Sequence, residues 1–111
     1  MPEARNYLAV DLGAESGRTM LGTCADEKLT LIETHRFPNG PVRLSDGLHW
    51  DVLRQWAEIK AGVAVTVKSG LELCSLGVDT WAVDFALLDK NGALLGNPFH
   101  YCDARTDGMM D

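Results

Sequence analysis

The residues best suited to chemistry form a short glycine-containing loop, Asp11 to Arg18, that directly follows an apolar run. Its sequence is Asp-Leu-Gly-Ala-Glu-Ser-Gly-Arg. Glycines let backbone N–H groups approach phosphate oxygens closely, and an arginine adds charge-assisted hydrogen bonds to the same oxygens. A carboxylate such as Asp11 would repel a phosphate directly, so its position makes sense when Mg²⁺ or water lies between the two. The pattern predicts a phosphate-binding loop with Asp11 in the Mg²⁺ shell.

Two other interpretations of this loop stay open. It fits an ordinary tight turn with a surface arginine, and Arg18 fits a structural salt bridge as well as it fits a phosphate ligand. A dinucleotide-binding fingerprint is disfavoured, because that motif opens a helix. Here residues 19–25 favour a strand, and the loop has no Gly-x-Gly spacing.

The elements that must position this loop are short strands and one helix. Apolar runs bounded by turn residues predict strands at 7–10, 19–25, 29–37 and 73–78. A helix is expected between Asp51, a good N-cap, and a stop at Ser69-Gly70. Three strands, a helix and a fourth strand predict an α/β fold with a mixed sheet, because a helical crossover makes the fourth strand parallel to a neighbour.

Periodicity predicts which side chains share a face. Spacings of three and four residues predict a buried helix face that includes Trp56; its members are Val52, Trp56, Ile59, Val63 and Val67. Alternation in the third strand, interrupted at Ile32, predicts one shared face made of Leu29, Leu31, Glu33, His35 and Phe37. Further along, Asn91-Gly92 between apolar runs is a strong hairpin signal.

Composition excludes several classes of protein. The chain has 111 residues, a net charge of −6 and a pI near 4.9, which disfavours binding to nucleic acid. It has no apolar run of about 18 residues that would span a membrane. Its three cysteines are far apart and odd in number, which favours reduced thiols in the cytoplasm over disulfides or a zinc site. His35 and His49 have no metal-ligand spacing and are expected in surface or loop positions.

Four segments together resemble one protein family. The loop at 11–21 is similar to the first phosphate loop of sugar kinases in the actin, hexokinase and Hsp70 superfamily. The segments at 35–39, 49–51 and 77–88, and the Tyr-Cys-Asp-Ala-Arg-Thr run at 101–106, resemble the FGGY carbohydrate kinases. The Asp-Thr-Trp-Ala-Val-Asp-Phe block is typical of the rhamnulokinase branch. The resemblance extends over nearly the whole chain.

The resemblance implies a ribonuclease-H-like, actin-like ATPase subdomain with a β-β-β-α-β order. It also implies ATP and Mg²⁺ as cofactors and ATP-dependent phosphorylation of the primary hydroxyl of L-rhamnulose, with the sugar and ATP as the partners. The residues expected to hold the nucleotide and its metal are Asp11, Gly13, Ala14, Glu15, Ser16, Gly17 and Arg18, with Asp11 as the metal-shell residue.

The same resemblance implies a sugar-binding wall. Its residues are Trp81, Ala82, Asp84 and Arg105, with Trp81 stacking on the sugar and Asp84 accepting hydrogen bonds from its hydroxyls. Ala82 stands where the family usually has glycine, and its methyl group would crowd a close backbone approach. Cys102 replaces the usual arginine, which removes a cation, whereas Asp103 and Arg105 are retained.

Family members are several times longer than this chain. Their second lobe, their adenosine-binding motif and their catalytic aspartate lie beyond the equivalent of Asp111, so residues 1–111 are expected to form the first subdomain of a longer chain, without a catalytic base. Two other functions stay open. A metal-dependent nuclease of the same fold would use carboxylates on the first and fourth strands, such as Asp11 and Asp79. A non-catalytic nucleotide-binding domain is the other.

Overall fold

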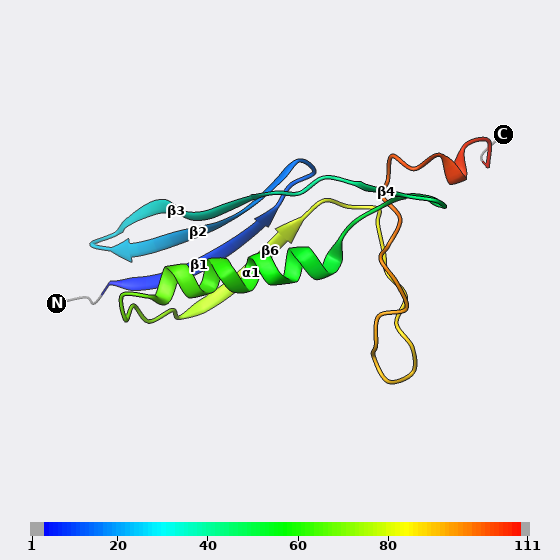
Figure 1. Cartoon of the computed structure of the whole chain (residues 1–111). Coiled ribbons are helices and arrows are strands. Elements are labelled where there is room, and N and C mark those ends of the chain that lie inside the picture. The colour runs from blue at the N-terminus through cyan, green and yellow to red at the C-terminus, as the bar shows by residue number, and fades with distance from the viewer. Residues whose placement is uncertain (1–3, 110–111) are drawn as a thin grey trace.

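A computed structural model describes residues 4–109 as a sheet, one long helix and an irregular C-terminal third (Figure 1). The strands are β1 (Arg5–Leu12), β2 (Ser16–Ala25), β3 (Lys28–Pro38), β4 (Val42–Leu44), β5 (Gly47–His49) and β6 (Ser75–Thr80), the helix is α1 (Val52–Val67), and a 3₁₀ helix η1 spans Ala104–Thr106. All four predicted strands and the predicted helix are present. Asp51 caps α1 as expected, because its side chain accepts a hydrogen bond from the N–H of Arg54 at 3.1 Å.

The four long strands form one mixed sheet in the order β3-β2-β1-β6. The pairs β1–β2 and β2–β3 are antiparallel hairpins, and β6 pairs with β1 in parallel. Helix α1 makes the connection that a parallel pair requires. The predicted mixed sheet is therefore confirmed, and the C-terminal end of β1 lies beside the C-terminal end of β6.

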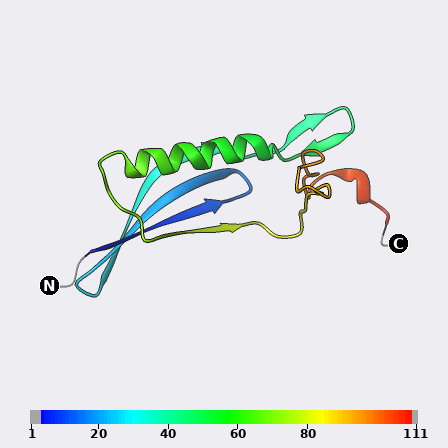
Figure 2. The same ribbon diagram turned by 90° about the horizontal axis from the view of Figure 1, so that it is seen from below.

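Helix α1 covers one face of the sheet (Figure 2). Beneath it lies a small core of Val10, Leu12 and Phe37, against which Ile59 and Trp81 pack. The helix approaches β2 closely because Gly62 has no side chain: a Cβ there would lie 2.5 Å from Cγ2 of Thr19.

The predicted buried face of α1 is wrong for Trp56 and Val67, which are 57% and 36% exposed. The buried residues of the helix are Gln55, Gly62 and Thr66, so small and polar side chains make the close contact. Thr66 donates a hydrogen bond to Thr34 on β3 at 2.9 Å. This orientation leaves Trp56 in an open apolar groove between α1 and β6; its lining residues are Trp56, Ile59, Lys60, Val63, Ala64, Leu76 and Val78.

The predicted single face of β3 is also wrong, because the register between β2 and β3 shifts opposite Thr19 and Met20. As a result, the consecutive residues Thr34 and His35 both contact α1, Thr34 at Thr66 and His35 at Glu58. Such a bulge reverses the alternation of the residues beyond it. Glu33 consequently pairs with Arg36 on an exposed part of the strand instead of facing the helix with His35.

Residues 38–109 contain little regular structure beyond α1 and β6. The stretch before the helix holds the short β4–β5 hairpin. The predicted hairpin at Asn91-Gly92 is present as an extended turn, in which the N–H of Leu95 donates to the carbonyl of Leu87 at 3.0 Å. Figure 1 shows residues 85–95, in yellow to orange, projecting away from the sheet.

The molecule is elongated. Its radius of gyration is 17.5 Å and its extents are 61 × 31 × 24 Å, whereas a compact chain of this length has a radius of gyration of about 13 Å. Large apolar side chains are consequently exposed on α1, β6 and the projecting hairpin, among them Trp56, Val78 and Phe85. Within residues 4–109, no helix has the length and apolar character needed to cross a bilayer.

Candidate functional site

The predicted phosphate loop is the turn between β1 and β2. The N–H of Gly13 donates to the carbonyl of Ser16 at 2.9 Å, which closes the turn. A Cβ on Gly13 would lie 2.9 Å from that same oxygen, so glycine is required for this close backbone approach. Glu15 is exposed and its neighbours Ala14 and Ser16 are partly exposed, and the loop continues into a strand rather than a helix. Its backbone is thus accessible to a ligand.

The second glycine of the loop has a different role. Gly17 is buried, and a Cβ on it would lie within 2.7 Å of three atoms of the Phe37 ring. Phe37 is itself only 3% exposed and belongs to the core under α1. Gly17 is therefore explained by packing of β2 on Phe37 rather than by approach of a phosphate.

Four charged residues form a row across the sheet beside the loop. Asp79 on β6 lies opposite Asp11 on β1, Asp11 lies opposite Arg18 on β2, and Arg18 lies opposite Arg36 on β3. Residues directly opposite each other point to the same face of a sheet. Because the neighbouring Val10 is buried under α1, this row lies on the face that α1 does not cover.

Ion pairs hold both arginines of the row. Nε of Arg18 donates to Oδ2 of Asp11 at 2.8 Å, so the structural salt bridge considered for Arg18 is present. Arg36 binds Oε1 of Glu33 through Nε and Nη2, at 2.9 and 2.6 Å, and its Nη1 donates to Oγ of Ser16 at 3.2 Å. Both guanidinium groups therefore lie at the edge of the phosphate loop.

The two carboxylates at the other end of the row perturb each other. A hydrogen bond shared with Asp79 lowers the pKa of Asp11, and the hydrogen bond from Arg18 lowers it further. The same shared hydrogen bond, with burial and the charge of Asp11, raises the pKa of Asp79. Two carboxylates side by side repel each other, which favours one bound proton on the pair. A divalent cation at this place would relieve the same repulsion.

The predicted sugar-site residues Trp81 and Asp84 are brought together with a residue that we did not predict, Trp50. The rings of Trp50 and Trp81 stack with centroids 3.9 Å apart. Both indole N–H groups donate to Oδ2 of Asp84, at 2.5 Å from Trp50 and 2.8 Å from Trp81. One face of Trp81 and one oxygen of Asp84 are thus already occupied within the protein.

A cavity of about 150 Å³ adjoins this indole pair; its lining residues are Trp50, Thr80, Trp81, Asp84, Phe85, Ala86 and Pro98. Ala82 is exposed between Trp81 and the residue Val83, which has a φ of 71°. A β-branched residue in this left-handed region is strained. The strained turn sets the spacing between the Trp81 and Asp84 side chains.

Arg105 contacts Phe99 and Asp103 rather than Asp84. Its guanidinium carbon is 4.3 Å from the Phe99 ring centroid, and its Nη1 is 3.8 Å from Oδ2 of Asp103. It lines a second cavity of about 380 Å³, beside the projecting hairpin, together with Phe85, Ala86, Leu87, Leu95, Gly96, Asn97, Pro98 and Phe99. The two cavities share residues of the hairpin, so the structure places Arg105 on an adjoining surface rather than in contact with Asp84.

Asp103 ties the C-terminal segment to the β4–β5 hairpin. Its Oδ1 accepts from the N–H of Leu48 at 2.7 Å, and its Oδ2 accepts from the N–H of Arg105 at 3.0 Å. These two backbone hydrogen bonds lower the pKa of Asp103. Asp103 thereby fixes the start of η1, which carries Arg105.

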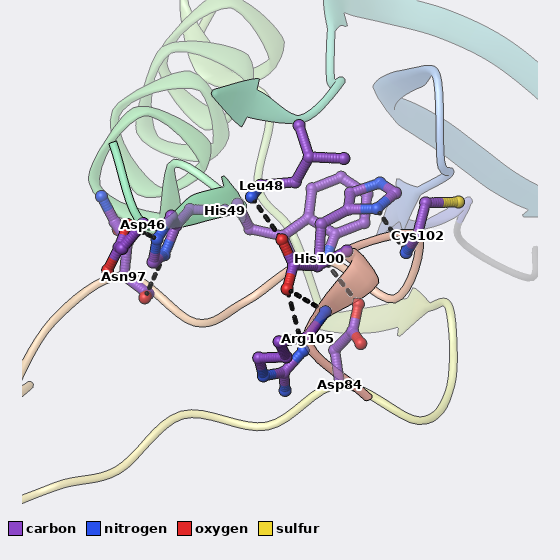
Figure 3. A network of polar contacts seen from close by, with 10 residues as sticks. Asp46, Leu48, His49, Asp84, Asn97, His100, Cys102 and Arg105 are labelled. Carbon is purple, nitrogen blue, oxygen red and sulfur yellow. Dashed lines mark hydrogen bonds and ion pairs between the residues drawn. The ribbon is translucent and has the colours of Figure 1, made fainter. Parts of the chain in front are cut away.

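The prediction of a surface position is wrong for His49, which is 6% exposed. Its Nδ1 faces the carbonyl of Asn97 at 3.0 Å and its Nε2 faces Oδ1 of Asp46 at 2.7 Å, as Figure 3 shows. Because both partners are acceptors, only the protonated ring satisfies both. The same hydrogen bonds, that of Asn97 first, raise the pKa of His49.

Sequence reasoning misses three further residues around the site. Trp50 is completely buried, Asn39 is 5% exposed and hydrogen-bonds to the loop, and Arg36 binds Ser16. In the sequence, Asn39 belongs to a chain-breaking Pro-Asn-Gly-Pro turn and to the 35–39 segment of the family resemblance, and neither gives it a contact with the loop. The signal that could have found them is a polar or aromatic residue next to a strand end or a helix cap. At such positions the backbone has N–H and C=O groups without partners, and a neighbouring side chain can bind them.

Known proteins that resemble this chain in sequence are rhamnulokinases. No family model matches the chain. Its sequence is 48% identical over 104 residues to a rhamnulokinase from Oceanobacillus iheyensis, covering 94% of this chain and 22% of that protein. It is 47% identical over 108 residues to a rhamnulokinase from Enterobacter sp. and 42% identical over 107 residues to one from Bacteroides thetaiotaomicron, covering 96% of this chain and 22% of each relative.

A solved structure gives an independent comparison of the fold. Xylulose kinase from Rhodospirillum rubrum superposes with a TM-score of 0.71 at 19% identity, over 94% of this chain and 22% of that chain. The chain thus spans about a fifth of the length of the proteins it matches. The expected actin-like ATPase type of α/β fold is confirmed. In sequence, 94–96% of this chain resembles the rhamnulokinases of the FGGY carbohydrate kinase family.

Proposed function

We propose that this chain forms the first subdomain of an ATP-dependent sugar kinase and supplies its phosphate loop and one wall of its sugar site. The observation that carries the proposal is the accessible turn from Gly13 to Ser16, bordered by the carboxylates Asp11 and Asp79 and by the guanidinium of Arg18. Phosphoryl transfer requires positioning and charge neutralisation more than covalent chemistry from the protein. This arrangement offers both.

For the nucleotide, we assign the backbone and side chains of the loop to the phosphates. Backbone N–H groups in a tight glycine turn bind anions, and Ser16 adds a hydroxyl that Arg36 holds. Arg18, 41% exposed, adds positive charge beside the loop. The remaining assigned residues are Ala14, Glu15 and Gly17, of which Gly17 acts by letting Phe37 pack beneath β2.

The acidic pair fits Mg²⁺. Magnesium is usually held by one or two carboxylates together with water and substrate phosphates. Asp11 and Asp79 are two adjacent carboxylates, and residues 4–109 contain no larger group of metal ligands. When bound, Mg²⁺ neutralises charge on the transferred phosphoryl group. Asp11, fixed by Arg18, would hold the metal shell in a constant orientation.

For the sugar, we propose L-rhamnulose, phosphorylated at its primary hydroxyl, because the relatives that are 42–48% identical are rhamnulokinases. Trp81 keeps one ring face for the sugar and Asp84 keeps one oxygen. Ala82 and Arg105 complete the proposed wall. The family resemblance implies that the catalytic aspartate belongs to another subdomain, and we propose that residues 1–111 alone do not turn over substrate. The proposed compartment is the cytoplasm, where its three unpaired cysteines stay reduced.

The nucleotide half of the proposal is tested on the chain itself by calorimetric titration with MgATP. We expect measurable binding that Arg18→Ala weakens about tenfold, since it removes a charge-assisted hydrogen bond. Arg5→Ala is the matched control, because Arg5 lies at the opposite end of β1. Absence of MgATP binding by the wild-type chain would refute the phosphate-loop assignment.

The sugar half is tested by replacing the matched segment of the O. iheyensis rhamnulokinase with residues 1–111. The chimera should phosphorylate L-rhamnulose in preference to D-xylulose. Preference for D-xylulose would overturn the substrate while keeping the kinase. No ATP turnover with any ketose, by a chimera that folds, would reject the kinase assignment.

A nuclease of the same fold is the second candidate, and the adjacency of Asp11 and Asp79 is what favours it. The ion pair between Arg18 and Asp11 and the net charge of −6 weigh against it. Tight binding of DNA or RNA in a gel shift at physiological salt would revive this candidate.

A further inference from the structure

The phosphate loop is held from behind by one buried side chain. Nδ2 of Asn39 donates to the carbonyl of Gly13 at 2.7 Å, and the backbone N–H of Asn39 donates to the carbonyl of Glu15 at 3.0 Å. Asn39 follows directly after β3 and is 5% exposed. Two of the carbonyl groups of the turn are therefore satisfied by a single residue that lies 26 positions away from Gly13 in the sequence.

These two hydrogen bonds fix the orientation of two peptide planes. In a trans peptide, the carbonyl of one residue and the N–H of the next point in opposite directions. With the carbonyl groups of Gly13 and Glu15 turned toward Asn39, the N–H groups of Ala14 and Ser16 point away from it. Asn39 therefore decides how the loop presents its N–H groups.

Asn39 is in turn held by α1. Its Oδ1 accepts from Nε2 of Gln55 at 2.9 Å, and Gln55 is 7% exposed. The partners fix the assignment of the Asn39 amide, because only a nitrogen can donate to the Gly13 carbonyl and only an oxygen can accept from the Gln55 amide. The chain of contacts from the loop through Asn39 to the helix is neutral, so it does not compete with a bound phosphate for charge.

We propose that Asn39, supported by Gln55, is a positioning residue that pre-organises the phosphate loop for its anionic ligand. The ligand rests on the proposed function, whereas the hold on the loop rests only on the contacts above. A pre-organised loop binds more tightly because less conformational freedom is lost on binding.

The test uses Asn39→Asp. Aspartate keeps the size of the side chain and the backbone N–H bond to Glu15, and it can still accept from Gln55, but it cannot donate to the Gly13 carbonyl. Amide hydrogen exchange of the ligand-free chain and MgATP titration are the two measurements. We expect exchange at the N–H of Gly13, which is hydrogen-bonded to Ser16 across the turn, to accelerate about tenfold, and exchange at Val10 in β1 to stay unchanged. The Kd for MgATP should rise about tenfold, the change that loss of one buried hydrogen bond produces.

Asn6→Asp is the matched control. Asn6 also donates its side-chain amide to a carbonyl, that of Glu72 at 3.4 Å, but at the far end of β1. It should leave both measurements at wild-type values. If Asn39→Asp fails to fold, Gln55→Met replaces it, because methionine fills the space of glutamine without donating to Asn39; it should show the same changes at smaller size.

The possible failures can be told apart. If a folded Asn39→Asp variant keeps wild-type loop exchange, or keeps wild-type affinity despite faster exchange, the positioning role is overturned. If the wild-type chain binds no nucleotide, the proposed function fails. In that case, amide exchange of the loop in the ligand-free chain still shows whether Asn39 holds the loop.

Discussion

Substitution of Gly17 by alanine separates the packing role of this glycine from a role in phosphate approach. The φ of Gly17 lies outside the left-handed region, so alanine can adopt the backbone conformation. Its added methyl group, however, would lie within 2.7 Å of three atoms of the Phe37 ring. The ring is 3% exposed and packed in the core, so it cannot turn into solvent without losing its burial.

The magnitude follows from two opposing effects. Alanine in a strand gains about 0.5–1 kcal/mol over glycine in backbone entropy. Overpacking of a core costs about 1–3 kcal/mol, and three ring atoms inside contact distance place Gly17→Ala at the upper end. We expect a net loss of about 2 kcal/mol in the free energy of unfolding. For a domain of this size, each kcal/mol lowers Tm by about 4–8 °C.

The assay is urea denaturation followed by tryptophan fluorescence, with two comparison variants. Gly77→Ala is the control, because Gly77 is also a strand glycine and a Cβ added to it would meet nothing within 4 Å. Phe37→Leu in the Gly17→Ala background should recover part of the loss, since it removes the ring that the methyl group meets. A Gly17→Ala variant as stable as Gly77→Ala, or losses that simply add in the double variant, would refute the packing explanation. If the double variant regains stability but does not bind MgATP, Gly17 has a role in phosphate approach as well as in packing.

Two more predictions concern the segments beyond the loop. Because the pKa of His49 is raised above its ordinary value of about 6.5, its contribution to stability is complete below that value and is lost as the pH rises through the folded-state pKa. The charges that face His49 are those of Asp46 and Asp103. The Tm difference between wild type and His49→Gln should therefore shrink from pH 6 to pH 9. A Tm difference that stays constant over this range would contradict a protonated His49 in the folded chain. Asp84→Ala should destabilise the chain by about 1–3 kcal/mol, because the buried Trp50 indole loses its acceptor, and should change the near-ultraviolet circular dichroism of the stacked indoles. Asp84→Asn keeps an acceptor oxygen, so its loss of stability and its change in circular dichroism should both be smaller.

The strands and their order could be predicted because local signals agree there. Apolar runs end at aspartate or proline, and Asp51 has the side chain that a helix start requires. The face of α1 could not be predicted from apolar periodicity. Its contact with β2 depends on how closely two backbones approach at Gly62 and Thr19, and that distance is a property of the fold. Periodicity assigns Trp56 to the core because it depends only on which residues are apolar. It contains no information on the distance between the backbones of α1 and β2.

The candidate site divides in the same way. The loop and Asp11 are contiguous with a strand end, and Asp79 ends the fourth strand, so the parallel pairing of β1 and β6 brings the two carboxylates together as topology requires. Asn39 and Trp50 escape prediction because their partners are distant, 26 residues away for the contact with Gly13 and 34 for the contact with Asp84. Residues that position a site are satisfied by long-range hydrogen bonds that no local pattern encodes.

The charged row also bears on the two roles considered for Arg18. Like charges directly opposite each other destabilise a sheet. Here Asp79 lies beside Asp11 at one end of the row and Arg18 lies beside Arg36 at the other. Among residues 4–109, Arg18 uses only Nε, toward Asp11, so its remaining N–H donors are available to an anion.

A cation at the acidic end and an anion at the basic end would each relieve a repulsion between neighbours in the row. The salt bridge between Asp11 and Arg18 then fixes the spacing between the two charges. A magnesium-bound phosphate has this charge order. A guanidinium held by the ion pair with Asp11 is therefore also placed for the phosphate contact that we propose, so the two roles considered for Arg18 are compatible.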